Sequence, residues 1–263
     1  MINLLSSELY KLKKSKCFRI AAIMTVLFAW FMETVDVVMR HAQPQYMEQR
    51  RQNIPYADVL DIIRQLFANS NAVMFVTIFV CVFVLGDYTS GAVKNYVGKG
   101  YRREEVYLAK FLVTELGAVF LYLLTAAAVY AGGIVCYGTG QLDGAFYYDF
   151  ISYLSMHILY LTGYTAIIIL VCELARNMAV GVIVSMLGIM LLSNVLVQAG
   201  DMAIQYFGAE FAVSKYWITT VMSSCPVTEI PAQFITSSGM ITGFWLILSL
   251  VAGMLYFTYK DVN

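Results

Sequence analysis

Long, unbroken runs of apolar residues alternate with short polar connections along most of this chain. Six runs are long enough to cross the hydrocarbon core of a bilayer, which is about 30 Å thick and needs about 20 apolar residues in a helix. The predicted spans are 18–39, 68–86, 110–136, 150–172, 178–199 and 239–258. Because the runs lack the alternation typical of membrane barrels, they predict helices rather than strands. The sequence therefore predicts an all-α polytopic membrane protein with a single transmembrane domain over residues 1–263.

The composition agrees with a membrane protein. Of the 263 residues, 60% are hydrophobic and only 13% are charged, which is more apolar than a soluble domain of this length. The formal net charge is +0, so no overall electric field attracts nucleic acid. We expect a lipid bilayer as a partner and no nucleic acid.

The distribution of basic residues predicts the orientation. If the N-terminus is cytoplasmic, most of the 17 basic residues fall in cytoplasmic segments. The basic residues left on the outer side are Arg40, Arg50, Arg51, Arg64 and Lys215. Cytoplasmic loops carry an excess of Lys and Arg, so both termini are predicted to be cytoplasmic.

The first 16 residues have a helical pattern of their own. Apolar residues recur at helical spacing at Ile2, Leu5, Leu9 and Leu12. The lysines of this segment point elsewhere, which predicts an amphipathic interfacial helix over 1–16. The alternatives are a merely charged N-terminus and a secretory signal, although no small-x-small cleavage pattern follows the apolar run.

The connection at 87–110 is polar, basic and longer than a tight helical turn requires. Gly91, Gly98 and Gly100 predict chain reversals rather than one continuous helix. Two interpretations remain open for its five basic residues. They contact a cytoplasmic partner, or they bind anionic lipid headgroups.

The same hairpin resembles a known family, the membrane-spanning permeases of type-2 ATP-binding-cassette (ABC) exporters, in particular the Gram-positive branch associated with bacitracin and lantibiotic resistance. The residues that carry the resemblance are Asp87, Tyr88, Gly91, Lys94, Asn95, Gly100, Arg102 or Arg103, and Lys110. Asp87 stands where the family usually has Glu, and Ala92 where it usually has Thr. The layout of an interfacial helix, six spans and a long outer segment is also similar.

The resemblance implies a transport subunit that works with other chains. A cytoplasmic ABC ATPase dimer would bind the hairpin as a coupling helix, and a second permease, identical or paralogous, would complete the substrate path. The coupling residues implied are Asp87, Gly91, Lys94, Gly98, Arg102, Arg103 and Lys110. ATP and magnesium would be bound by the ATPase, with no cofactor in this chain. The substrate would be hydrophobic or a peptide, such as an antimicrobial peptide, expelled from the cell membrane of a Gram-positive bacterium.

Motifs for catalysis are missing from the sequence. There is no G-x-x-x-x-G-K-[ST] phosphate loop, so ATP binding by this chain is not expected. The five cysteines have no C-x-x-C spacing, and the two histidines, His41 and His157, form no H-E-x-x-H motif. We therefore expect no catalytic residues and no metal site. The alternative to a permease is a non-transporting six-span anchor, immunity or signalling protein.

Two acidic residues lie near the outer end of the first predicted span. Glu33 and Asp36 are three residues apart and therefore share a face of the helix. Charged groups inside a membrane are rare and face protein or water. The pair either lines a substrate pathway or marks the outer interface.

Three further residues are candidates for a pathway or for interhelical contacts. Glu115 lies five residues beyond Lys110, so pairing with Lys110 or another base is the simpler interpretation. His157 and Asn194 either line a pathway or bond to neighbouring helices.

The sequence of the two outer connections says less about their structure and role. Residues 200–238 mix short apolar pieces with Pro226 and Pro231, which favours a re-entrant segment over a small external subdomain. The loop 40–67 carries both signs of charge and indicates a solvated surface, with recognition of a charged peptide as the alternative.

Overall fold

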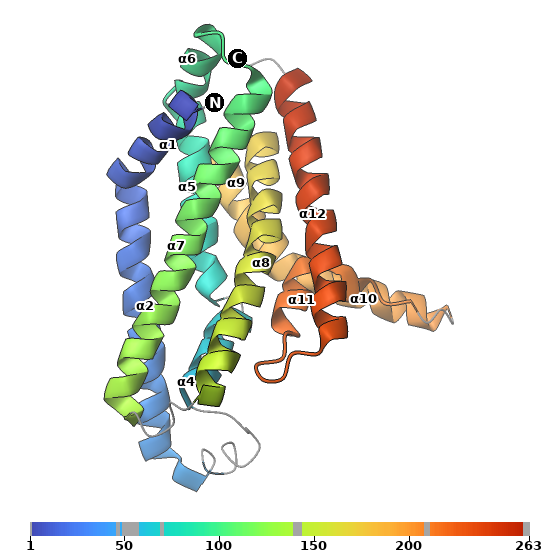
Figure 1. Ribbon diagram of the computed structural model, residues 1–263. Coiled ribbons are helices and arrows are strands. Elements are labelled where there is room, and N and C mark those ends of the chain that lie inside the picture. Colours follow the sequence, from blue (N-terminus) through green and yellow to red (C-terminus); the bar gives the residue numbers. More distant parts are fainter. Residues whose placement is uncertain are drawn as a thin grey trace.

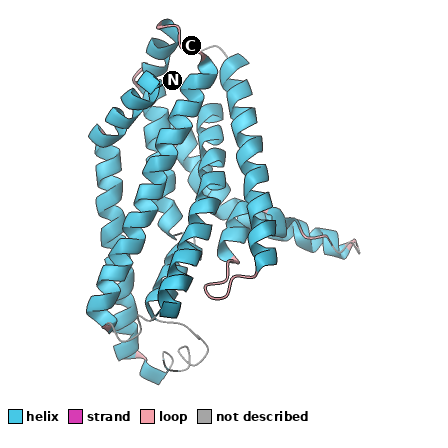
Figure 2. Cartoon of the chain, viewed as in Figure 1, coloured by secondary structure: helices cyan, strands magenta, loops and turns pink. Residues whose placement is uncertain are grey.

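A computed structural model of the chain describes residues 2–45, 48, 58–68, 71–138, 144–207 and 211–259. Within these ranges the regular structure is entirely helical (Figure 2). The helices are α1 (Ile2–Lys14), α2 (Lys16–Ala42), α4 (Asp58–Ala68), α5 (Asn71–Thr89), α6 (Ala92–Gly98), α7 (Arg103–Tyr137), α8 (Gly144–Ala175), α9 (Met178–Ile183), η1 (Val184–Leu192), α10 (Ser193–Tyr206), η2 (Val213–Tyr216), α11 (Ile218–Ser223) and α12 (Ala232–Tyr259).

Five helices of the described chain are long and apolar enough to cross a membrane: α2, α5, α7, α8 and α12. They run roughly alongside one another and form the body of the molecule (Figure 1). Most of α5 and α8 is buried, whereas most of α2 and α12 is not. The outward faces of α2 and α12 carry large apolar side chains such as Phe31 and Ile247. Such faces are stable in lipid and unfavourable in water.

The sixth predicted span, 178–199, is not confirmed as a span. This stretch is helical, but it is divided into α9, the π-helix η1 and α10. In Figure 1, α10 leaves the bundle sideways instead of continuing along it. A π-helix has wider turns than an α-helix and changes the direction in which side chains point. Hydropathy detected the apolar composition here but carries no information about the bend.

The predicted outer segment, 200–238, contains the end of α10, η2, α11 and the first turns of α12. The carboxylate of Asp201 accepts hydrogen bonds from the backbone N–H groups of Val213 (2.5 Å) and Ser214 (3.2 Å). Hydrogen bonding from Ser214 lowers the pKa of Asp201, because it stabilises the charged form. Ile218 and Met222 of α11 are buried against the bundle. The position of this segment relative to a bilayer stays a prediction.

The hairpin between α5 and α7 contains the short helix α6, which lies at one end of the bundle (Figure 1). Gly91 and Gly100, on either side of α6, have φ angles of +70° and +82°. Glycine adopts this left-handed conformation without the steric penalty of other residues. The reversals predicted at these two glycines are confirmed, and Gly98 is the last residue of α6. Helix α7 begins at Arg103, seven residues before the predicted span.

Helix α1 packs against the same end of the bundle. Its buried residues are Leu4, Glu8 and Leu12, which are spaced four apart on one face. Ile2 and Leu9, from the apolar pattern in the sequence, are exposed. The helix therefore has one face on the protein and apolar side chains on another. That the second face lies on a lipid leaflet stays a prediction.

Candidate functional site

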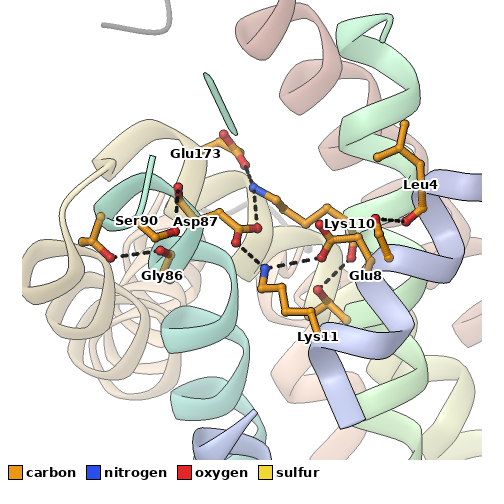
Figure 3. Close-up of polar contacts among 11 residues, drawn as sticks. Leu4, Glu8, Lys11, Gly86, Asp87, Ser90, Lys110 and Glu173 are labelled. Atoms are coloured by element: carbon orange, nitrogen blue, oxygen red, sulfur yellow. Dashed lines mark hydrogen bonds and ion pairs between the residues drawn. The ribbon is translucent and has the colours of Figure 1, made fainter. Parts of the chain in front are cut away.

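Five charged residues meet where α1, α5, α7 and α8 converge, close to α6 (Figure 3). We call them the ion-pair cluster: Glu8, Lys11, Asp87, Lys110 and Glu173. Glu8, Asp87, Lys110 and Glu173 are each at most 1% exposed. Charged residues are almost never this deeply buried unless they are paired.

Asp87 is the centre of the ion-pair cluster. Its Oδ1 atom accepts a hydrogen bond from Nζ of Lys11, and its Oδ2 atom lies 3.5 Å from Nζ of Lys110. Nζ of Lys11 also lies 3.3 Å from Oε2 of Glu8. Nζ of Lys110 lies 3.8 Å from Oε1 of Glu173. Acidic and basic groups therefore alternate, and each lysine has two carboxylates beside it.

Aromatic rings complete the surroundings of the cluster. The hydroxyl of Tyr88 donates to Oε2 of Glu173, and the Tyr88 ring lies 4.9 Å from Nζ of Lys110. The guanidinium of Arg176 lies 5.6 Å from the same ring. Cations are attracted to aromatic faces at such distances, more strongly where water is excluded. Tyr88 therefore connects the cations of α7 and of the α8–α9 turn to the carboxylate of Glu173.

The cluster fixes four helices at one geometry. In a water-excluding site, removing one partner leaves an uncompensated charge, which costs about 3–5 kcal/mol. Lys11 belongs to α1, Asp87 to α5, Lys110 to α7 and Glu173 to α8. A displacement of one of these helices must therefore either carry the others along or break an ion pair.

Helix α6 presents polar residues at the surface beside the cluster. Lys94 and Asn95 of α6 and Lys99 and Arg102 shortly after it are exposed, whereas Val93 is 1% exposed and anchors the helix. The phenol of Tyr96 lies next to Ser7 and Glu8 of α1, and its burial raises the pKa of the Tyr96 hydroxyl. Helix α6 is thus held by the bundle and by α1, with its basic side chains directed to solvent.

The structure places the seven predicted coupling residues in three environments. Lys94 and Arg102 are exposed on or beside α6, while Gly91 and Gly98 belong to its boundaries. Asp87 and Lys110 lie inside the protein and pair with each other, so their charges are not presented to a partner.

Arg103 has a third environment. Its Nη1 donates to the backbone oxygen of Thr258 at 2.9 Å, which joins the start of α7 to the end of α12.

Glu33 and Asp36 both lie on the buried side of α2, 2% and 8% exposed. Asp36 accepts hydrogen bonds from Nε of Arg40 and from the hydroxyl of Tyr137, both at 2.8 Å. Because Tyr137 belongs to α7, Asp36 is an interhelical contact. Glu33 faces α7 at Gly132.

The expected pairing of Glu115 with Lys110 is wrong. Glu115 accepts a hydrogen bond from the hydroxyl of Thr165 on α8, while Lys110 pairs with Asp87 and Glu173. Residues five apart in an α-helix point about 140° apart, so Glu115 and Lys110 face different neighbours.

His157 and Asn194 make interhelical contacts. The His157 ring is fully buried, with the rings of Tyr153, Tyr160 and Phe67 at 4.3, 5.7 and 5.6 Å. Asn194 of α10 accepts a hydrogen bond from the hydroxyl of Thr219 on α11. Asn194 therefore bonds to a neighbouring helix, as one of the two interpretations expected, whereas His157 contacts α4 through the Phe67 ring and its two ring nitrogens have no hydrogen-bond partner among the described residues.

Four residues at the cluster were not identified as parts of a site from the sequence, although Tyr88 belongs to the family pattern: Glu8, Lys11, Tyr88 and Glu173. Glu8 has a sequence signal, because it stands between Leu4 and Leu12 on the same helical face. Glu173 ends a long apolar run, where a carboxylate is unusual. Neither signal indicates the partner, because the partners come from other helices.

A bundle of membrane-length apolar helices, with a short basic helix anchored at one end by buried ion pairs, defines the class of multi-pass membrane proteins. Residues 4–192 match the family model described as ABC-2 family transporter protein. The match extends from α1 to the end of η1 and contains the whole ion-pair cluster. The chain therefore belongs to the ABC-2 transporter family and is a permease component of an ABC transporter. No curated protein sequence matches it significantly. Membership in this family implies an ATPase partner.

Proposed function

We propose that this permease couples ATP hydrolysis in a separate ATPase dimer to the export or expulsion of a hydrophobic or peptide substrate. An antimicrobial peptide of the lantibiotic or bacitracin type is the proposed substrate class, and resistance or immunity the outcome. The hairpin residues that resemble the Gram-positive resistance branch support this proposal. ATP and magnesium would be bound by the ATPase. Both termini would be cytoplasmic, as the distribution of basic residues indicates. The resemblance implies that the membrane is that of a Gram-positive bacterium.

The observation that carries the coupling proposal is the position of α6 next to the ion-pair cluster. Its exposed basic residues are available to a partner, and Tyr96 and Val93 hold it to the protein. Asp87 lies in the last turn of α5, a few residues before α6, and is paired with α1 and α7. A force applied to α6 is therefore transmitted to several helices together, as a rigid-body transition requires.

The exposed and the buried residues of the hairpin have different proposed roles. Lys94, Lys99 and Arg102 contact the ATPase through their charges. Gly91 and Gly100 provide the turns that orient α6. Asp87 and Lys110 transmit the movement inside the bundle.

Charge reversal on α6 tests the coupling role. The variant Lys94→Glu, Lys99→Glu, Arg102→Glu should insert normally but lose co-purification with the ATPase and lose substrate-stimulated ATP hydrolysis, because the attractive charges become repulsive. Arg103 is left unchanged because it binds the carbonyl of Thr258. The measurement is ATPase activity of the reconstituted complex in nanodiscs with candidate peptides.

Lys13→Glu is the matched control, because Lys13 is an exposed lysine on α1 away from α6. It should leave ATPase binding intact. Normal coupling in the α6 variant would overturn the assignment. A loss that appears only in membranes with anionic lipids would instead identify lipid binding as the role of the hairpin.

A second permease subunit completes the proposal. The faces of α10 and α12 carry exposed apolar side chains, including Leu196, Met202, Phe244 and Ile247. They are available to lipid or to an identical or paralogous copy. A chain that purifies without any ATPase and binds no second copy would support the alternative of a non-transporting anchor, immunity or signalling protein.

A further inference from the structure

A cavity of about 330 Å³ lies between α2 and α7. It is lined by Trp30, Glu33 and Thr34 of α2 and by Gly132, Val135 and Cys136 of α7. These residues lie in the last part of each helix, at the end of the bundle opposite α6 (Figure 1). The cavity therefore does not belong to the ion-pair cluster. The cavity is open at the surface of the protein, because Trp30 is 50% and Val135 is 85% exposed.

Glu33 brings a buried carboxylate to this cavity. Its side chain is 2% exposed, and its Oε1 atom has no hydrogen-bond partner in the described part of the chain. The neighbouring base Arg40 is bound to Asp36. A buried acidic group without a cation beside it is unfavourable in a membrane.

Gly132 creates the space for this carboxylate. Oε2 of Glu33 lies only 1.6 Å from the position that a Cβ atom on residue 132 would occupy. No other residue type leaves room for the group where it lies. The position of the carboxylate at the cavity thus depends on a glycine in the facing helix.

Trp30 adds an aromatic surface to the same cavity. Its indole N–H donates to the backbone oxygen of Ala128 on α7 at 3.3 Å, which orients the ring. An aromatic face and a carboxylate both attract cations, and the remaining lining is mostly apolar. The volume is at the lower end of the range for ligand sites, so it suits a headgroup with a short apolar portion rather than a whole peptide.

We propose that this cavity binds the ammonium group of a cationic amphiphile, with Glu33 as the counter-ion and Trp30 as the aromatic contact. The ammonium group comes either from a single-chain amphiphile in the membrane or from an aminolipid headgroup. This inference goes beyond the proposed function, because binding requires neither ATP nor an ATPase.

Cys136 provides a direct test, since it lines the cavity and is exposed. The full chain in nanodiscs is treated with two methanethiosulfonate reagents, one with a trimethylammonium group and one with a sulfonate, and modification of Cys136 is followed by peptide mass spectrometry. After division by their rates with free 2-mercaptoethanol, the cationic reagent should react about tenfold faster than the anionic one, because Glu33 attracts it. This correction is needed because the reacting thiolate is itself an anion and favours the cationic reagent even when no carboxylate is near.

Two variants separate the electrostatic effect of Glu33 on Cys136 from that of the other charges nearby. Glu33→Gln keeps the shape of the side chain and should reduce the corrected ratio of the two rates to about one. Asp36→Asn removes the same charge three residues away, from a carboxylate bound by Arg40 and Tyr137, and should leave most of the preference. An absent preference in the unmodified chain, or an equal loss in both variants, would overturn the proposal.

Ligand protection tests occupancy. Dodecyltrimethylammonium below its micellar concentration should slow the reaction of Cys136 with N-ethylmaleimide about fivefold, whereas neutral dodecyl maltoside should not. Gly132→Ala should abolish the protection, because the added Cβ displaces the Glu33 carboxylate. Equal protection by both amphiphiles would contradict the proposal, because it would show that the ammonium group is not recognised.

Nanodiscs with and without phosphatidylethanolamine distinguish the two sources of the ammonium group. Slower labelling of Cys136 in the phosphatidylethanolamine discs, lost in Glu33→Gln, assigns the site to an aminolipid. Equal labelling in the two kinds of disc, together with protection by dodecyltrimethylammonium, assigns it to single-chain amphiphiles. Because no ATPase is present, the outcome of these experiments is independent of the outcome of the coupling experiment.

Discussion

Asp87 is held between two lysines, Lys11 of α1 and Lys110 of α7, in a part of the protein that excludes water. Such an arrangement contributes specificity more than net stability, because removing charges from water offsets most of the attraction between them. Its consequence is that neither lysine can leave without exposing an unpaired carboxylate. The cluster therefore favours the arrangement of helices in which all of its ion pairs are intact.

A substitution at Lys110 tests the ion-pair cluster. Lys110→Met should destabilise the fold by about 3–5 kcal/mol, because Glu173 loses its lysine and Asp87 keeps only Lys11. The measurement is thermal or denaturant unfolding in detergent. The double variant Lys110→Met, Glu173→Gln should recover part of the loss. With Glu173→Gln measured alone as well, losses that add up in the double variant would show that the Lys110–Glu173 pair carries no energetic coupling.

At the scale of elements, α6 depends on the two left-handed turns that flank it. Gly91 and Gly100 allow the chain to reverse direction without strain, and apart from the adjacent residues no atom of the described chain lies within 4 Å of a Cβ added there. Glycine is therefore required at these positions for its backbone conformation and not for its small size. Substitution should therefore change the orientation of α6 and leave the bundle core unchanged.

Gly100→Ala tests this requirement. The left-handed conformation costs a non-glycine residue about 1–2 kcal/mol, so coupling should weaken while insertion stays normal. Gly100→Asn is the matched control, because Asn tolerates this conformation better than Ala and should retain more ATPase stimulation. Equal activity of the two variants would show that the turn geometry is not limiting. ATPase binding and stimulation are the measured quantities.

At the scale of the whole molecule, the long helices run along one axis of the bundle, and α6 lies at one end of it (Figure 1). The ion-pair cluster lies at one end of this axis and the cavity at Glu33 near the other. Under the proposed orientation, the cluster is cytoplasmic and the cavity is toward the outside. A conformational change driven at α6 would thus reach the cavity along α7, which runs from Arg103 to Tyr137.

Cysteine accessibility tests the orientation. Lys99→Cys, beside α6, should react with a membrane-impermeant thiol reagent only after the cells are opened. Lys215→Cys, in η2, should react on intact cells, since both lysines are exposed and lie in segments predicted for opposite sides. A variant with Cys136→Ser as background removes the exposed native cysteine. Reaction of Lys99→Cys on intact cells would reverse the topology.

The long spans were predictable because hydropathy depends on composition within one stretch of chain. Five of the six predicted spans correspond to helices of membrane length, although α7, α8 and α12 extend beyond the predicted limits. The sixth failed because a π-helix and a bend lie inside an apolar run of ordinary composition. The contact between Glu115 and Thr165 could not be predicted either, because a neighbour across two helices is set by their rotation and offset.

By itself, the amino-acid sequence determined that the chain is helical and membrane-embedded, that it reverses direction at Gly91 and Gly100, and that a basic hairpin follows the second span. These are local properties, set by the hydrophobicity of successive residues and the freedom of glycine. Only the tertiary structure decided that Asp87 and Lys110 face inward, that Glu8 and Glu173 join them, and that Glu33 lies against Gly132 in a cavity. The physical reason is that ion pairs and cavities form between side chains far apart in sequence, and their geometry depends on how the helices pack.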